Sequence, residues 1–426
     1  MQIRESYWQR DAGWRDGWAG AAIRNRVDFA VLGGGLAGLM TAIRLREREP
    51  GAEIALLEAE RVGYGASGRN AGFLSPLAAP IWLLGAERSA EQAWAAARVN
   101  AEVHAIAGWL AAHVPGCELR PARLGLAAGG RLADGSLREF ARAAERVGLA
   151  HGLVESRARP GHLCLEMAAY TVHPYQLVRG LAEHAARAGV RIHERARVRA
   201  VEEAAAGARV RLEDGRAIQA GKVIVCTNAY TGAIDVGERV RALVVHSFMA
   251  ATAPIEGAAA GTIVRDGDFT VEVNAAQAYH RMHGGRIIYG GIDKIRAPAG
   301  GDFAVPAGVR SGLARHMRAS FPGVDEIAIA EAWSGRFHAT ATGLPILRPS
   351  AASPAVILNV GYGGTGVALA LACAPLAAAV AAGGAFASDG DARLLSVIRE
   401  TRISVRDSVR ALARVVGGLA RPWRAA

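Results

Sequence analysis

The sequence predicts an α/β protein in which a nucleotide-binding unit near the N-terminus is joined to a separate region rich in strands. An apolar run at 27–32 passes through a glycine-rich turn into helical spacing over 36–43, which is the order of elements in a βαβ unit. Helical spacing returns over 87–114, and four strand-like segments lie between 240 and 295. The 426 residues are enough for two domains of ordinary size.

The composition is that of a globular protein. Hydrophobic residues make up 51% and charged residues 21% of the chain, which argues against disorder. The four cysteines are far apart and fit no metal-ligand spacing, so we expect no metal site. Cys226 and Cys373 lie in apolar runs and are expected to be buried, inert thiols. These features, and an N-terminus without an apolar signal-peptide core, favour a cytoplasmic location.

The formal net charge of +11 raises the alternatives of a nucleic acid or a membrane as partner. The arginines are scattered along the chain, often beside alanine, so we expect no nucleic-acid partner. The longest apolar run, 367–382, is interrupted by Pro375 and is shorter than the ~20 residues that span a bilayer. We therefore expect a buried helix there.

The two ends of the chain have aromatic and basic patterns. The segment 7–18 is rich in tryptophan and is expected to pack across the protein as a structural element. Near the C-terminus, Val405, Val409, Leu412 and Val416 share one face of a predicted helix, with arginines beside them. We predict a docking helix whose basic side is in solvent. A helix that lies on a membrane is the alternative.

Gly33, Gly35 and Gly38 take the three glycine positions of a G-x-G-x-x-G turn between the first strand and the first long helix. The first glycine permits a tight turn, the second lets the backbone approach a pyrophosphate, and the third lets the helix pack close to the strand. Glu58 ends the second strand twenty residues after Gly38, where an acid accepts hydrogen bonds from a ribose. NAD and FAD have the same ADP half, so this βαβ unit does not indicate which of the two cofactors is bound.

The next segment, 63–73, reads GYGASGRNAGF and is irregular, with many small and polar residues. NAD needs nothing of this kind at that place, whereas FAD extends further beyond its pyrophosphate. Exposed amides and the side chains of Ser67 and Asn70 would then lie beside the ribityl chain. On composition alone, an ordinary surface loop is an equally good interpretation.

Five motifs in a fixed order carry a family resemblance: GGGLAGL (33–39), EAERVGYGASGRNAGF (58–73), CTNAYTG (226–232), WSGRFHATATGLPIL (333–347) and VGYGGTGVALA (360–370). With them the chain resembles the D-amino-acid oxidase-like flavoprotein family, most of all its γ-glutamylputrescine oxidase-like and glycine oxidase-like members. The likeness implies a Rossmann-type FAD-binding domain with an inserted antiparallel-sheet substrate domain, the glutathione-reductase-like or D-amino-acid-oxidase-like fold. It also implies oxidation of an amine C–N bond.

The resemblance assigns the cofactor to FAD, held without a covalent bond because the loop has Arg69 and no histidine, which attaches flavin in some relatives. It implies that the early glycine turn binds the pyrophosphate, that the loop lines the flavin, and that the late glycine-rich segment places a helix N-terminus at the flavin pyrimidine. Val198, Thr227 and Asn228 match the adenine side. The implied cofactor residues are Gly33, Gly34, Gly35, Leu36, Ala37, Gly38, Glu58, Ala59, Gly65, Ala66, Ser67, Arg69, Asn70, Ala71, Gly72, Val198, Thr227, Asn228, Gly335, Gly361, Gly363, Gly364, Thr365, Gly366 and Val367.

For the substrate, the resemblance implies strands that roof the flavin. Adjacent residues of a strand face opposite sides, and the family pattern favours Tyr279 and Arg281 toward the flavin, with a solvated edge charge at Arg281 as the alternative. No catalytic acid or base is assigned, since the flavin is the electron sink. The implied substrate-binding residues are Tyr279, Arg281, Trp333, Arg336, His338 and Tyr362.

The departures from the family pattern bear on the substrate. Glycine oxidase-like members have an arginine for the substrate carboxylate where this chain has Phe337. We therefore predict a primary or secondary alkylamine, either γ-glutamylputrescine-like or with another distant acidic group read by Arg281 or Arg336. The alternatives are a D-amino acid, glycine or sarcosine oxidase, a flavoprotein acting on a modified tRNA base, and a flavin-binding scaffold without turnover. Strand 286–291 has no lysine, and Lys294 comes later, so oxygen and another electron acceptor both stay open.

The expected domains follow from the order of the motifs. Segments 1–76, 146–239 and 331–390 form a discontinuous FAD-binding domain. Segments 77–145 and 240–330 form the substrate-binding domain, and 391–426 form a helical tail.

Overall fold

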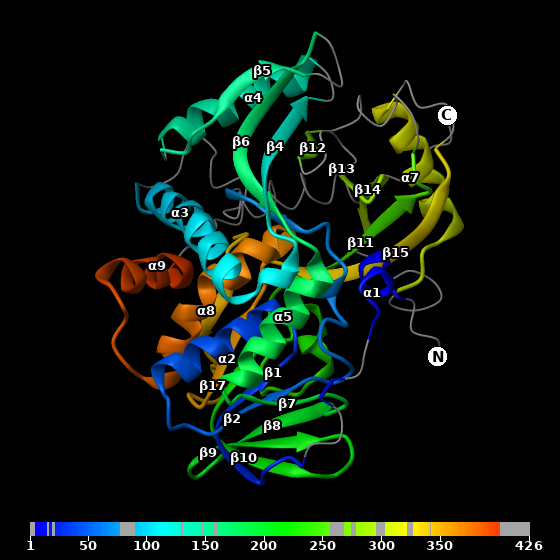
Figure 1. Ribbon diagram of the computed structural model, residues 1–426. Coiled ribbons are helices and arrows are strands. Elements are labelled where there is room, and N and C mark those ends of the chain that lie inside the picture. Colours follow the sequence, from blue (N-terminus) through cyan, green and yellow to red (C-terminus); the bar gives the residue numbers. More distant parts are fainter. Residues whose placement is uncertain are drawn as a thin grey trace.

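The computed structural model describes residues 5–14, 17–18, 22–76, 90–128, 131–146, 148–156, 161–255, 268–273, 278–294, 303–321, 327–340 and 342–400. The predicted tail helix with Val405 lies outside these residues. Within them the chain forms two sheets, the first below and the second above in the view of Figure 1. The α/β prediction is confirmed.

The first sheet has the strand order β16-β17-β10-β1-β2-β7. Its central strands pair in parallel, as expected for strands buried between layers. The strands are β1 (Arg26–Leu32), β2 (Ile54–Leu57), β7 (Arg191–His193), β10 (Ala217–Val225) and β17 (Val356–Val360), with antiparallel β16 (Ile346–Pro349), β8 (Val198–Ala204) and β9 (Gly207–Leu212) at the margins.

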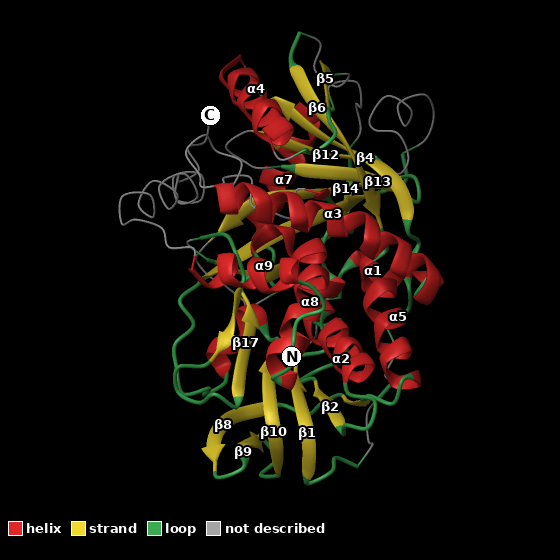
Figure 2. Cartoon of the chain, turned by 90° about the vertical axis from the view of Figure 1, so that its left-hand side faces the viewer, coloured by secondary structure: helices red, strands yellow, loops and turns green. Residues whose placement is uncertain are grey.

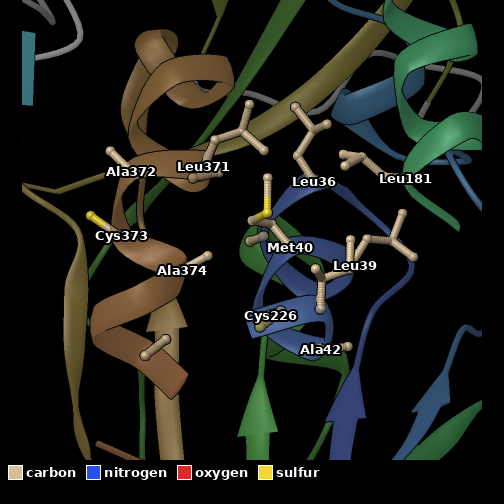
Figure 3. Close-up of a cluster of buried hydrophobic side chains, with 14 of the residues drawn as sticks. Leu36, Leu39, Met40, Ala42, Leu181, Cys226, Leu371, Ala372, Cys373 and Ala374 are labelled. Carbon is tan, nitrogen blue, oxygen red and sulfur yellow. The ribbon is translucent and has the colours of Figure 1, made fainter. Parts of the chain in front are cut away.

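Helices cover one face of this sheet and bury its core. Helix α2 (Leu36–Arg48) packs against α8 (Gly366–Ala382) and α5 (Pro174–Arg187). Figure 3 shows Met40 of α2 and Leu371 of α8 among the side chains that fill the space between these helices. Helices α3 (Ala90–His113) and α9 (Asp389–Glu400) pack on the same group. The predicted helix at 87–114 is confirmed from Ala90 onward.

Helix α8 is the apolar run that the sequence singles out. Residues Gly363–Ala382 are long and apolar enough to cross a membrane by length and composition, yet 72% of the apolar window is buried inside the protein. Its residue Cys373 is fully buried, and so is Cys226 at the end of β10. Burial raises the pKa of both thiols to about 12, which favours the protonated form, and the predicted burial of both is confirmed.

The second sheet has the order β15-β11-β14-β13-β12-β4-β6-β3, with β5 beside β6. Neighbouring strands pair antiparallel except β12 and β4, which are parallel. The strands are β3 (Phe73–Leu74), β4 (Arg120–Ala128), β5 (Gly152–Glu155), β6 (Leu163–Thr171), β11 (Leu243–Thr252), β12 (Phe269–Val273), β13 (Tyr279–His283), β14 (Arg286–Lys294) and β15 (Ile329–Ala339). The four strands predicted between 240 and 295 are β11 to β14.

Sheet membership differs from the expected domain boundaries. Strands β5 and β6 follow residue 146 and most of β15 follows residue 331, yet all three belong to the second sheet. The chain returns to the first sheet only after it has completed these strands, so boundaries drawn at motif ends cut through the second sheet.

The two faces of the second sheet have different neighbours. The outer face carries Phe248 and Tyr289, which pack against α7 (Ala307–Ser320), while α4 (Arg131–Arg146) covers β4 and β6. Figure 2 shows α4 beside β5 and β6 at the top of the molecule, while α7 lies lower, near β14. The inner face carries Met249, Ile288 and Trp333 and packs against α1 (Tyr7–Asp11) and the loop at 63–72.

The aromatic N-terminal segment has the predicted structural role. Trp8 of α1 is fully buried. The Ser6 hydroxyl donates to the Gly68 carbonyl at 2.8 Å, and the Gln9 amide donates to the Gly63 carbonyl at 3.0 Å. Helix α1 therefore fixes the loop at 63–68 from outside.

Candidate active site

Three loops of the first sheet meet at the carboxyl ends of adjacent parallel strands. Strand β1 ends at Leu32, β10 at Val225 and β17 at Val360, and these strands are hydrogen-bonded neighbours. The Gly361 amide donates to the side-chain oxygen of Asn228 at 3.1 Å, which joins the second loop to the third. Ligands of open α/β sheets bind at this edge.

The early glycine turn has the conformation that a pyrophosphate site needs. Gly33 has φ +107°, a conformation that favours glycine. A Cβ atom on Gly38 would lie 2.0 Å from the Gly33 carbonyl oxygen, so helix and turn approach too closely for any side chain. Gly35 is the N-cap of α2 and makes no side-chain capping bond. The turn thus presents a helix N-terminus where an anion is stabilised.

Glu58 lies beside this turn. Its carboxylate accepts from the Gly34 amide at 2.7 Å and from the Glu60 amide at 2.9 Å. Burial nonetheless raises the pKa of Glu58 to about 7, and the charges of Glu60 and Glu194 add to this effect. The acid at the end of β2 is therefore held at the turn, as the ribose assignment requires, and Ala59 follows it directly.

The loop at 63–72 is organised by its own side chains. Asn70 donates to the Ala66 and Ser67 carbonyls at 3.1 and 2.8 Å and accepts from the Gly72 amide at 2.7 Å. The Ser67 hydroxyl accepts from the Leu36 amide at 3.0 Å, which ties the loop to the start of α2. Gly65, Ala66, Ser67 and Asn70 are partly exposed beside the turn, so they can line a cofactor.

Three predicted loop residues are buried within the protein instead. Ala71 and Gly72 are buried, and Arg69 is only 2% exposed. The Arg69 guanidinium lies 3.7 Å from the centre of the Phe303 ring, and its Nε donates to the Tyr64 carbonyl at 2.8 Å. Burial lowers its pKa to about 10. The prediction that the Arg69 side chain lines the flavin is therefore not supported: the side chain holds the loop against the second sheet.

The late glycine-rich segment forms a hook before α8. Gly361 has φ +88° and Gly363 has φ +60°. Gly363, Gly364, Thr365 and Gly366 are partly or fully exposed, and Val367 begins the buried part of α8. The N-cap residue Thr365 makes no side-chain capping bond, so the helix presents free N–H groups and the positive end of its dipole.

Three residues are predicted for the adenine side: Thr227 and Asn228, which follow β10, and Val198, which begins β8. Thr227 packs its methyl group against the early turn, 3.4 Å from where a Cβ of Gly33 would be. Asn228 has φ +43°, an uncommon conformation that Asn tolerates. Val198, in β8, is buried in the core of the first sheet, so a cofactor contact there would use its backbone.

Tyr279 and Arg281 lie on the inner face of the second sheet, as favoured, while His280 between them stacks on Tyr289 of the outer face. Arg281 is only 5% exposed, and its Nη1 donates to the carbonyls of Ala71, Gly72 and Val172 at 3.3, 3.3 and 3.0 Å. Arg281 is thus neither a solvated edge charge nor placed to read a substrate acid. It fastens the loop to the sheet.

Two other predicted substrate residues also have structural positions. Trp333 is 1% exposed, and its indole donates to the Arg69 carbonyl at 2.8 Å. Tyr362 is 3% exposed in the core beside α8, and its hydroxyl donates to the Asn359 side chain. Burial raises the pKa of Tyr362 well above its usual range. Trp333 is buried within the inner face and Tyr362 is buried in the core of the first domain, so neither side chain is exposed toward a substrate.

The remaining predicted residues lie along β15, whose side chains alternate between the faces. Gly335 faces the loop: a Cβ there would lie 4.0 Å from Ala66 Cα and 3.6 Å from Arg69. Phe337 shares this face, opposite Val245 of β11. Arg336 faces the other way and lies 4.0 Å from the centre of the Tyr230 ring. His338 is buried, and burial together with the charge of Arg336 lowers its pKa to about 4.

Sequence patterns did not identify two polar residues of the inner face. Ser247 of β11 has its hydroxyl 3.1 Å from the Tyr279 hydroxyl, and it also hydrogen-bonds Asp293 of β14. Burial raises the pKa of Asp293 to about 6. A serine and an aspartate in strands carry no motif, and their meeting depends on strand register. Among the described residues, no group of His, Cys, Asp and Glu could hold a metal ion.

The fold and the three loops define a protein that binds a dinucleotide at the edge of a parallel sheet beneath a second sheet. The profile of the FAD-dependent oxidoreductase family, DAO, matches residues 28–380. The chain therefore belongs to this family, and FAD is its cofactor.

Individual relatives support the same assignment. The chain is 26% identical over 374 residues to the probable oxidoreductase OrdL of Rhizobium meliloti, a match that covers 84% of this chain and 83% of that relative. It is 51% identical to the γ-glutamylputrescine oxidoreductase of Escherichia coli, over 47 residues and 11% of each chain. The crystal structure of glycine oxidase from Geobacillus kaustophilus superposes with a TM-score of 0.74 at 20% identity, over 89% of this chain and 100% of that one.

Proposed function

We propose that this protein oxidises a primary or secondary alkylamine whose amine carbon bears no free carboxylate. When bound, FAD would supply the redox chemistry, as the acceptor of a hydride from the carbon beside the nitrogen. The protein's part is to hold the cofactor without a covalent bond, to exclude water and to position the amine.

The observation that carries the proposal is the inner face near Gly335. Phe337 lies there, paired with the buried, apolar Val245. The resemblance to glycine oxidase-like proteins implies an arginine at this position in those proteins. The neighbouring Arg336 alternates to the opposite side of β15, and its guanidinium stacks on Tyr230, a ring that lies beside Gly65 of the loop. Arg281, the other basic residue predicted for the substrate, donates to three backbone carbonyls. Both guanidinium groups are thus engaged within the protein, Arg281 by backbone carbonyls and Arg336 by the Tyr230 ring, which supports a substrate without a carboxylate next to the reacting carbon.

The chain's own residues fit the cofactor half of the task. The glycine turn and the hook offer two helix N-termini, and the loop at 63–72 offers accessible backbone between them. The N-terminus of α8 at the hook would stabilise negative charge on a reduced flavin held there. The match to the γ-glutamylputrescine oxidoreductase of Escherichia coli supports an amine of this general kind, with γ-glutamylputrescine-like compounds among the substrates to test.

The experiment is anaerobic mixing of the FAD-loaded protein with n-butylamine, N-methylbutylamine, D-alanine and glycine, with flavin bleaching as the signal. The alkylamines are expected to reduce the flavin at least about tenfold faster than the amino acids, because a carboxylate finds no cationic partner and costs about 1.4 kcal/mol or more. Faster reduction by D-alanine or glycine would contradict the proposal.

A variant makes the same test sharper. Phe337→Arg places a guanidinium on the inner face and is expected to raise the rate with D-alanine relative to n-butylamine by about tenfold, the worth of one charge-assisted pair. Phe337→Leu is the matched control, since it changes the side chain without adding charge. An unchanged substrate ratio in Phe337→Arg would show that this position does not face the substrate.

A further inference from the structure

Strand β14 departs from regular pairing where it passes β11. Its partners change from Phe248 with Gly291 to His246 with Lys294, so two residues of β14, Ile292 and Asp293, stand opposite the single residue Ser247. This is a β-bulge, a feature that often re-aims a side chain next to an active site. Ile292 has φ +60°, a strained conformation for a β-branched residue. The bulge turns the Asp293 carboxyl toward Ser247.

This carboxyl lies on the face of the sheet that meets the cofactor loop. Ser247 pairs with Gly335, the residue that approaches Ala66 of the loop. Elsewhere on the inner face, side chains such as Met249 and Ile288 are buried. Ser247, Tyr279 and Asp293 are each partly exposed. The polar residues therefore occupy the part of the inner face that a small molecule can reach.

The three polar residues form a chain of hydrogen bonds. The Tyr279 ring lies across Gly290, where a Cβ atom would be 2.2 Å from the ring. Its hydroxyl reaches Ser247 at 3.1 Å, and Ser247 hydrogen-bonds Asp293. Glycine at 290 is thus the reason that a tyrosine from β13 can reach past β14 to β11. The chain holds the carboxyl in one orientation.

One oxygen of this carboxyl has no partner. Asp293 Oδ1 is buried and accepts no hydrogen bond, and no lysine, arginine or histidine among the described residues forms an ion pair with Asp293. The adjacent Lys294 is the nearby cation whose field favours the ionised form. A carboxylate oxygen that is shielded from water and has no paired cation is costly unless a ligand supplies one.

We propose that Asp293, oriented by Ser247 and Tyr279, binds a positively charged nitrogen of the substrate that is not the reacting one. This inference rests on the proposed function and deepens it: the substrate class is an aliphatic diamine or longer polyamine. The reacting amine must be neutral to lose a hydride, and a carboxylate beside it would hold it protonated. A carboxylate therefore suits the second, non-reacting ammonium group, which it anchors by a charge-assisted hydrogen bond.

The test compares 1,4-diaminobutane with n-butylamine in anaerobic flavin reduction, where the dependence of the rate on amine concentration gives an apparent Kd and a limiting rate. In the wild-type protein the diamine is expected to have an apparent Kd about tenfold lower than the monoamine. In Asp293→Asn the ratio of the two Kd values is expected to fall to about one, because the diamine loses its anchor and n-butylamine has no second ammonium group to lose. The exposed Asp214, whose partner is Arg216 on the surface, gives the matched control Asp214→Asn, which keeps the diamine advantage.

Other outcomes overturn the inference separately from the proposed function. If the wild-type protein binds both amines with the same Kd, Asp293 does not bind a second ammonium group. This outcome can be seen without any variant. If Asp293→Asn weakens both amines by the same factor, the residue has only a structural role. If no amine bleaches the flavin, the proposed function itself fails. Reduction by n-butylamine without a diamine advantage leaves the proposed function intact and removes only this inference.

Discussion

On the nucleotide side of the site, the residues that we propose for the cofactor lie in the backbone of three turns, whereas those that we propose for the substrate are side chains of adjacent strands in the second sheet. The turn at Gly33 and the hook at Gly361 both end parallel strands and begin or precede helices. Across from them, Ser247, Tyr279 and Asp293 meet because three different strands are in register. The nucleotide side therefore depends on the conformation of loops, and the other side depends on the register of paired strands.

This difference separates cofactor binding from substrate choice. A backbone site depends on glycine conformations and close approaches, so a single added methyl group is expected to damage it. A side-chain site on a rigid sheet can change its chemistry one residue at a time while the sheet stays the same. Phe337 illustrates this, since it lies in a regular stretch of β15, at the position where the resemblance to glycine oxidase-like proteins implies an arginine. Cofactor and substrate specificity are therefore expected to respond to different mutations.

The largest expected effect is on the nucleotide side. In Gly38→Ala the new Cβ would lie 2.0 Å from the Gly33 carbonyl oxygen, so the turn or the helix must move. We expect the Kd for FAD to rise by about 100-fold or more, equivalent to about 2.7 kcal/mol. Titration of the apoprotein with FAD, followed by quenching of flavin fluorescence, measures this.

Gly51→Ala is the control for that experiment, because Gly51 is exposed and a Cβ there meets nothing within 4 Å. It is expected to bind FAD like the wild type. If Gly38→Ala also bound FAD normally, close packing of helix and turn would not be what builds the site.

The nucleotide side could be predicted from the sequence because its signals are local. Gly33, Gly38 and Glu58 lie within one βαβ unit, and each residue type follows from the conformation or contact that the turn needs. The hook at Gly361–Gly366 follows a strand and precedes a helix in the same way. Local order along the chain was sufficient for these elements.

The second sheet could be predicted only as a set of strands. The face of Arg281 follows from alternation along β13, but its bonds to Ala71, Gly72 and Val172 depend on packing between distant segments. Tyr362 shows the same limit, since a tyrosine in a glycine-rich hook does not reveal that its ring turns into the core. Asp293 depends on the bulge at Ile292, and neither composition nor periodicity predicts a bulge.

A second, smaller effect tests how the two sides are joined. Arg281→Met removes a charged donor from three buried carbonyls and is expected to lower the free energy of unfolding by about 1.5–3 kcal/mol. The loop it fastens is one of the segments that we propose to line FAD, so the Kd for FAD should rise about tenfold. Thermal unfolding with and without FAD, together with the titration above, measures both changes. Arg199→Met is the control, since Arg199 makes a surface ion pair with Glu213 at 3.7 Å, of the kind that adds little.

The same variant separates two roles for Arg281. A residue that fastens the loop should leave the Kd ratio of n-butylamine to D-alanine unchanged once the protein is saturated with FAD. A change in that ratio, with normal stability, would show instead that Arg281 contacts the substrate.

The smallest expected effect concerns pH and again lies on the nucleotide side. Burial raises the pKa of Glu58 to about 7 in the protein without cofactor, so the group is partly protonated at neutral pH. Ribose hydroxyls donate to the ionised carboxylate, so FAD binding favours loss of this proton. The affinity for FAD is therefore expected to rise as the pH increases through about 7 and to level off above it.

Glu58→Gln should abolish this rise and weaken binding at pH 8 by about fivefold, or about 1 kcal/mol. The titration repeated between pH 5.5 and 8.5 measures both. A pH dependence that survives in Glu58→Gln would come from another group, and Glu194, whose charge acts on Glu58, is the first to replace by glutamine.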